Sequence, residues 1–161
     1  MSDEKQLEQD MLTFQSSRFG EIAVTAESVI EFPVGLVGFG RAQRFVLLEY
    51  KAPFSWLHSV EDPNLAFVVV DGFEFGKKHS LKAPMGDRTC DLQETDEYAI
   101  LIIVTVRGDP RLTTANLKAP LFINLRNRKG VQVIYDDQRL STRAPMWEEE
   151  GEQTSGAEEK K

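Results

Sequence analysis

Short apolar segments separated by turn residues dominate the middle of the chain, and they predict β-strands rather than helices. Apolar and polar positions alternate in 11–15 and 19–24, which indicates a first hairpin. The runs 65–70 and 98–106 are rich in apolar β-branched residues, which is typical of strands buried on both faces. Further strands are predicted at 29–32, 44–50, 54–60, 119–125 and 131–135.

Helical signals are weak by comparison. No stretch of ten or more residues shows the 3.6-residue apolar stripe of an amphipathic helix, and short helical turns are expected only at 91–96 and 112–118. Segment 76–97 is polar and rich in turn residues, so we expect either a short helix with loops or a mobile excursion. The basic stretch 126–130, with glycine at its end, predicts a hairpin turn. Many strands without covering helices favour a mainly all-β, antiparallel barrel or sandwich.

The net charge of −7 is concentrated at the two ends of the chain. Residues 1–10 carry −3, residues 148–161 carry −4, and residues 11–147 sum to zero. We therefore expect disordered acidic ends at 1–10 and 148–161 around a single domain at 11–147. A neutral body argues against direct nucleic-acid binding, which requires a basic surface. Within this body, residues 11–106 carry a net charge of −5 and residues 107–147 carry +5. The domain has an acidic face and a basic face only if the fold keeps these two parts on separate sides.

Other features favour a cytoplasmic protein. The single Cys90 excludes an internal disulfide and is typical of a reducing compartment. The acidic N-terminus lacks the apolar stretch of a secretory signal. The longest apolar run, 99–104, falls far short of the ~20 residues that span a bilayer, so no membrane association is expected.

The residue types needed for catalysis, cofactors or metals do not form a recognisable pattern. A metal site needs three or four converging ligands, whereas His58, His79 and Cys90 contain no closely spaced pair. His58 lies in a predicted strand and is expected to be a hydrogen-bonded structural residue. Cys90 is flanked by Asp91 as well as Arg88, and it lacks the electropositive setting of a nucleophile. No catalytic, cofactor or metal residue is therefore predicted, and the chain is not expected to be an enzyme.

Apolar side chains occur in several turn-rich places. Leu36, Val37 and Phe39 lie among glycines, Phe73 and Phe75 alternate in a polar context, and Met146–Trp147 precede the acidic end. Such residues either fold back onto the core or face a partner.

Three motifs give the chain a family resemblance. They are I-x-F-P-x-G-x-x-G-F at 30–39, W-L-x-S-V-E-D-P-x-L-A-F-V-V-V at 56–70 and T-A-N-L-x-A-P-x-x-I-N at 114–124. Together they resemble the flagellar assembly factor FliW family of small bacterial β-proteins, roughly over residues 12–145. The resemblance implies a small antiparallel β-barrel-like domain without catalysis.

The resemblance also implies partners. Members of the family bind flagellin in the cytoplasm, and they bind CsrA, an RNA-binding translational repressor that silences flagellin messenger RNA. Because the two partners compete for one protein, flagellin synthesis is coupled to flagellin export. A monomer is expected, and neither nucleic acid nor a membrane is an expected partner.

Three groups of residues are candidates for partner contact. The apolar loop contributes Leu36, Val37 and Phe39, the acidic turn Glu61 and Asp62, and the basic turn Arg126, Arg128 and Lys129. An acidic turn suits a basic RNA-binding partner.

Two parts of the chain fall outside the family pattern. Segment 76–97 does not match the short acidic helix expected there. The acidic end after Trp147 is either inert or imitates phosphate charge.

The sequence leaves two other classes of function as alternatives. A ligand-binding or enzymatic barrel requires a polar-lined cavity with perturbed titratable groups. A nucleic-acid-binding barrel stacks bases on strand aromatics, and its affinity falls steeply with salt.

Overall fold

The computed structural model describes residues 10–75 and 81–147, so nearly all of the expected acidic ends lies outside the described residues. Short helical turns occur at η1 (Ala26–Ser28), α2 (Gly72–Phe75) and η3 (Pro110–Leu112). The strands of the described part are β1 (Met11–Ser16), β2 (Gly20–Thr25), β3 (Ile30–Glu31), β4 (Arg44–Glu49), β5 (Ser55–Ser59), β6 (Ala66–Asp71), β7 (Tyr98–Thr105), β8 (Thr114–Ala115), β9 (Leu121–Asn124), β10 (Lys129–Gln132) and β11 (Ala144–Pro145).

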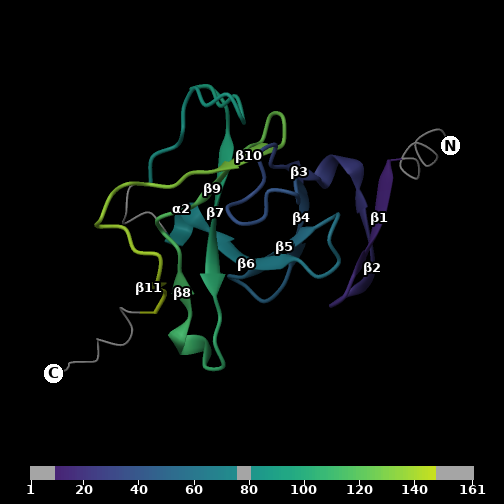
Figure 1. Ribbon diagram of the computed structural model, residues 1–161, viewed down its shortest axis with the longest axis horizontal. Helices are drawn as coiled ribbons and strands as arrows, with labels where there is room; N and C mark the ends of the chain where they lie inside the picture. Colours follow the sequence, from purple (N-terminus) through teal and green to yellow (C-terminus); the bar gives the residue numbers. More distant parts are fainter. Residues whose placement is uncertain (1–9, 76–80, 148–161) are drawn as a thin grey trace.

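Seven of these strands close into a barrel (Figure 1). Neighbouring strands pair in the order β7-β6-β5-β4-β3-β10-β9, and β9 pairs back onto β7. The prediction of a mainly β, barrel-like domain is therefore confirmed. One pairing departs from the antiparallel expectation, because β10 runs parallel to β3 with Lys129 opposite Glu31.

Two apolar cores lie on opposite faces of β6 and β7. One contains Phe32, Phe45, Leu57, Val69, Leu101 and Leu121. The other, with Val70, Ile100 and Ile102 from the same strands, is closed by Cys90, Leu92, Ala115 and Leu117. Successive side chains of a strand point to opposite faces, so a strand between two cores must be apolar at every position. This explains the unbroken apolar runs in the sequence.

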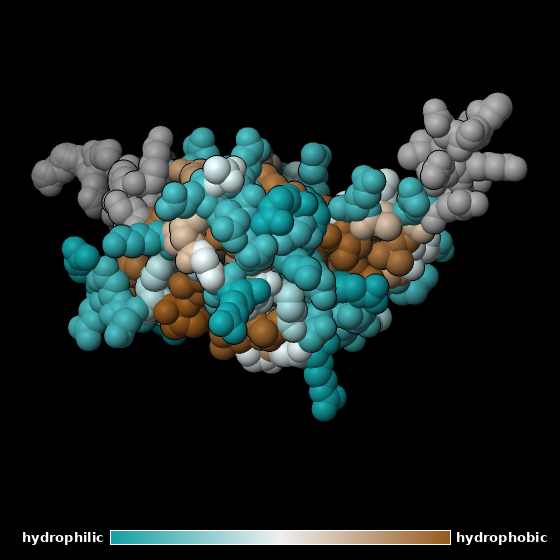
Figure 2. All heavy atoms as spheres, turned by 90° about the horizontal axis from the view of Figure 1, so that it is seen from above, coloured by the Kyte–Doolittle hydropathy of each residue, from teal (hydrophilic) through white to brown (hydrophobic). Residues whose placement is uncertain are grey.

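The predicted hairpin β1–β2 forms a separate two-stranded sheet beside the barrel. The hairpin packs on β5, where the rings of Phe14 and His58 lie 5.6 Å apart. Buried His58 donates from Nδ1 to the Ser59 carbonyl at 2.8 Å, and its Nε2 accepts from the Ser16 hydroxyl at 2.8 Å. The structural role expected for His58 is therefore confirmed. Figure 2 shows hydrophobic surface at this end of the molecule.

The helical turns predicted from the sequence are mostly wrong. Residues 91–96 form irregular turns, and in 112–118 only Leu112 belongs to a 3-10 turn, followed by β8. Side chains compete here for the backbone donors that a helix needs. Asp96 Oδ2 accepts from the Gln93 N–H at 3.0 Å, and Asn116 Oδ1 accepts from the Lys118 N–H at 3.1 Å.

The turn between β9 and β10 is shorter than predicted and is closed by an unexpected residue. Gly130 lies within β10 rather than ending the turn. It packs against Phe32, since an added Cβ would lie 2.6 Å from the Phe32 ring. The left-handed conformation instead falls on Arg128, at φ +60°. Gly130 is therefore required by packing and not by turn geometry.

Candidate functional site

The glycine-rich loop 33–41 is a fixed structure that leads into β4. The Gly35 N–H donates to the Phe32 carbonyl at 2.7 Å, and the Phe39 N–H donates to the Leu36 carbonyl at 2.7 Å. Gly35 has φ +72°, and a Cβ on it would lie 2.5 Å from the Gly40 Cα. Only glycine satisfies both conditions. The backbone of the loop thus crosses itself closely at Gly35 and Gly40.

The three apolar candidates of this loop do not share one environment. Leu36 is 3% exposed and belongs to the barrel core, so its side chain is not presented at the surface. Val37 and Phe39 are 65% and 41% exposed. The backbone N–H of Val37 is held at 2.8 Å by the Gln132 side chain on β10. Within this loop, Leu36 therefore packs into the core, whereas Val37 and Phe39 lie at the surface.

A surface groove of about 430 Å³ separates this loop from the acidic turn before β6. Its lining combines an apolar floor with a charged rim: Gly38, Phe39, Gly40, Arg41, Ala42, Asp62 and Leu65. The Phe39 ring packs edge-on against Phe67, with centroids 5.3 Å apart. The fold thus brings together two of the three candidate groups for partner contact: the apolar loop, through Phe39, and the acidic turn, through Asp62. We call this feature the loop groove.

Glu61 is used inside the protein. Its Oε1 accepts from the backbone N–H groups of Gln43 at 2.9 Å and Arg44 at 3.2 Å, and its Oε2 lies 3.3 Å from the Arg44 Nε. Partial burial raises the pKa of Glu61, but these hydrogen bonds outweigh it and hold the pKa below its ordinary value. Glu61 therefore fastens the start of β4.

Asp62 has the opposite character. Its Oδ1 accepts from the Asn64 N–H at 2.9 Å, which closes the turn, and its side chain lines the loop groove. No basic side chain pairs with Asp62 among residues 10–75 and 81–147. Of the two predicted acidic candidates, Asp62 is the one whose charge is available at the groove.

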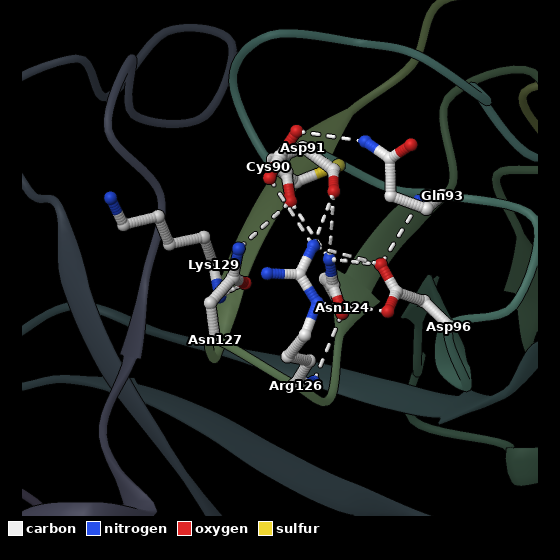
Figure 3. Close-up of polar contacts among 8 residues, drawn as sticks. All are labelled: Cys90, Asp91, Gln93, Asp96, Asn124, Arg126, Asn127 and Lys129. Atoms are coloured by element: carbon white, nitrogen blue, oxygen red, sulfur yellow. Dashed lines mark hydrogen bonds and ion pairs between the residues drawn. The ribbon is translucent and has the colours of Figure 1, made fainter.

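The first basic candidate, Arg126, is held in an internal network (Figure 3). Its guanidinium lies 2.9 Å from Asp96 Oδ1 and 3.2 Å from Asp91 Oδ2, and donates to the Asp91 carbonyl at 2.8 Å. The hydrogen bond from Arg126 holds the pKa of Asp96, whose side chain is 8% exposed, well below its usual range. Arg126 therefore ties loop 81–97 to the β9–β10 turn.

The other two basic candidates also differ from each other. Arg128 donates to the Ser28 carbonyl at 2.9 Å, and its Nε is buried. Lys129 is exposed on β10, and in Figure 3 its amine points away from the Arg126 network. The structure thus commits Arg126 and Arg128 to internal contacts. It does not bring the basic turn into the lining of the loop groove.

Of the seven lining residues, only Phe39 and Asp62 were among the sequence candidates, and the largest side chains missed are Arg41 and Leu65. Arg41 follows the glycine loop directly, and Leu65 follows the acidic turn. Arg41 could have been found as the charged residue nearest the glycines. Leu65 could not, because it reads as part of an apolar strand. Within the described ranges, no three His, Cys, Asp or Glu side chains are grouped as metal ligands, and no helix is long and apolar enough to cross a membrane.

The fold and the groove define a class of protein: a small closed β-barrel with a preformed groove on its surface. The family model described as FliW protein matches residues 13–146. The chain belongs to the FliW family.

Individual relatives agree with this assignment. The chain is 38% identical over 138 residues to the flagellar assembly factor FliW of Geobacter sulfurreducens, covering 83% of this chain and 86% of the relative. It is 36% identical to that of Natranaerobius thermophilus, covering 88% and 97%. A crystal structure of the flagellar assembly factor FliW superposes with a TM-score of 0.75 at 29% identity, covering 84% of this chain and 96% of that one.

Proposed function

We propose that this protein is a non-enzymatic flagellar assembly factor of the cytoplasm that binds flagellin and antagonises the repressor CsrA. Membership of the FliW family supports a role in flagellar assembly. The choice of flagellin and CsrA as the specific partners follows from the family resemblance of the three motifs in 30–39, 56–70 and 114–124. Binding is the only activity that this mechanism requires.

The observation that carries the proposal is the loop groove. An apolar floor with one available acid and one base on its rim suits a protein segment that inserts an apolar side chain and pairs its charges at the edge. The rigid loop adds affinity, because little conformational entropy is lost when it binds. Asp62 favours a basic partner such as an RNA-binding protein.

Competition follows if flagellin and CsrA share the groove. Each partner then lowers the occupancy of the other by mass action, without any conformational change. When flagellin is exported, the groove becomes free and captures CsrA, and translation of flagellin resumes.

The test is titration calorimetry with purified flagellin and purified CsrA. Asp62→Asn keeps the acceptor that closes the turn but removes the charge, and we expect about threefold to tenfold weaker CsrA binding at low salt. The matched control is Asp136→Asn, which removes an exposed charge outside the groove. Equal CsrA affinities for the two variants across a salt series contradict the role of Asp62.

The apolar floor has its own test. Phe39→Ala should weaken binding of both proteins by about tenfold or more, because a buried aromatic anchor dominates such an interface. Phe73→Ala is the control, since Phe73 is also an exposed aromatic in contact with a second ring, that of Tyr98. If neither flagellin nor CsrA binds the wild-type protein, the proposed function is wrong.

A further inference from the structure

The β1–β2 hairpin is a two-stranded sheet, so both of its outer edges lack a neighbouring strand in the described part of the chain, and β1 is the strand without a charged residue. The Ala26 N–H donates to the Asp10 carbonyl, which makes Asp10 and Ala26 a hydrogen-bonded pair of the ladder. In an antiparallel ladder such pairs alternate with non-hydrogen-bonded ones, so the backbone groups of Met11, Thr13 and Gln15 point away from β2. Within residues 10–75 and 81–147, none of these three residues has a hydrogen-bond partner outside the hairpin.

This edge also lacks the features that usually prevent strands from pairing. The six residues of β1, Met-Leu-Thr-Phe-Gln-Ser, contain no charge and no proline. Natural edge strands are commonly protected by lysine, proline or a bulge. Met11, Thr13 and Gln15 are exposed, with Met11 at 44%. β1 lies at the margin of the molecule, and hydrophobic surface is visible at this end (Figures 1 and 2).

The net negative charge of the hairpin region favours a basic partner at this edge. Residues 10–31 contain four acidic residues and one basic residue, a net charge of −3. The one base, Arg18, lies over the Trp56 ring at 4.5 Å at the tip of the hairpin. Two copies of this chain would bring two acidic hairpins together, which is unfavourable. A basic segment gains both backbone hydrogen bonds and charge complementarity.

We propose that the outer edge of β1 is a docking site for an extended, basic segment of a partner protein, which adds to the hairpin as a third strand. Met11, Thr13 and Gln15 supply the backbone donors and acceptors, as in other cases of strand addition. The acidic residues of the hairpin region, Asp10 and Glu21 among them, attract the basic side chains of the segment. This surface is distinct from the loop groove, and the proposal does not depend on flagellin or CsrA.

The experiment uses the full chain and a short synthetic peptide of alternating valine and threonine residues with lysines at both ends. We expect saturable binding that weakens as salt increases. Amide hydrogen exchange should slow at Met11, Thr13 and Gln15, while Leu12 and Phe14, already bonded to β2, change little. A peptide of the same sequence that is N-methylated at alternate residues should not bind, because it cannot form the ladder.

A pair of proline variants separates the two edges of the hairpin. Thr13→Pro removes an N–H that points outward, and proline is tolerated on edge strands. Its directly opposed neighbour Ala23 occupies the equivalent position on β2. We expect Thr13→Pro to weaken peptide binding about tenfold or more and Ala23→Pro to leave it within about twofold. Thr13→Lys is the second variant, and should weaken binding without removing a backbone donor.

Several results would overturn the proposal. Equal peptide affinity for Thr13→Pro and Ala23→Pro, or for Thr13→Lys and wild type, excludes the β1 edge. Protection that falls on loop 33–41 instead of β1 places the peptide in the loop groove. A dimer seen by sedimentation without peptide, with the same three amides protected, shows that the edge is occupied by a second copy. Because neither flagellin nor CsrA takes part, these outcomes are distinguishable from failure of the proposed function.

Discussion

Replacing Asn124 with alanine should release loop 81–97 from the barrel. The buried Asn124 amide donates to the carbonyls of Cys90 at 2.9 Å and Asp91 at 3.2 Å, and to Asp96 Oδ2 at 3.1 Å. Its Oδ1 accepts from the Arg126 N–H at 3.0 Å. One side chain at the end of β9 therefore connects the loop and the β9–β10 turn.

The cost of this substitution can be estimated from the bonds lost. Each neutral hydrogen bond contributes about 1 kcal/mol net, a bond to a charged group about 1.5–3 kcal/mol, and buried groups left unpaired add a desolvation penalty. Asn124→Ala should therefore lower the free energy of unfolding by about 3–5 kcal/mol, a large share of the ~5–15 kcal/mol typical of a domain. The loss should open the loop before the barrel unfolds.

Urea unfolding followed by tryptophan fluorescence and circular dichroism measures this change. The matched control is Asn127→Ala, since half-buried Asn127 donates once to the same Cys90 carbonyl, at 3.1 Å, and accepts once from the Lys129 N–H, at 2.9 Å. We expect a loss of about 1–2 kcal/mol for the control. Asn124→Asp keeps the shape but places a carboxylate beside Asp96. Burial and Asp96 raise the pKa of that new carboxyl group, so this variant should regain stability relative to wild type as the pH falls from 7 towards about 5.

Three results would refute this reasoning. A loss below about 1 kcal/mol for Asn124→Ala means that the amide contributes no more than a surface group. An Asn124→Asp variant whose stability relative to wild type does not depend on pH contradicts the assigned contact with Asp96. Unchanged hydrogen exchange in residues 87–97 of Asn124→Ala shows that the loop is held by its apolar residues alone.

Three further predictions test other parts of the structure. Gly35→Ala should lower the free energy of unfolding, measured in urea, by at least about 2 kcal/mol more than Gly38→Ala. Both glycines have positive φ, but an added Cβ collides with the Gly40 backbone only at Gly35. Asp96→Asn should be less stable than wild type near neutral pH, because the pKa of Asp96 is lowered in the folded protein. The stabilisation by ionised Asp96 is complete above the ordinary pKa of 3.8 and is lost as the pH falls below it, so the difference between the two proteins should shrink in acid. A difference that does not change with pH contradicts this role. Burial raises the pKa of Tyr135 to about 12, so a late phase of the ultraviolet titration should vanish in Tyr135→Phe. The contribution of the protonated Tyr135 phenol to folding stability is complete below the ordinary pKa of 10.0 and is lost as the pH rises towards 12.

Patterns between near neighbours predicted most of the strands correctly. The alternation in 11–15 and 19–24 anticipated β1 and β2, and the apolar runs anticipated β6 and β7 between two cores. The period of side chains along a strand is a local property, so it can be read from the sequence. Predictions that depended on local propensity alone failed at 91–96, because the side chains of Asp96 and Asn124 bind the backbone groups of Gln93 and Asp91 there.

The candidate site was only partly predictable, for a related reason. The sequence by itself determined that apolar residues and acids lie in turns at 36–39 and 61–62. The tertiary structure decided that Leu36 is core and Phe39 is surface, and that Glu61 is bonded to a strand start 17 residues away whereas Asp62 faces the groove. It also joined Val37 to Gln132, 95 residues apart, and bound Arg126 to Asp96, 30 residues apart. Whether a charge is available to a partner depends on such long-range contacts, which only the closed barrel brings into reach.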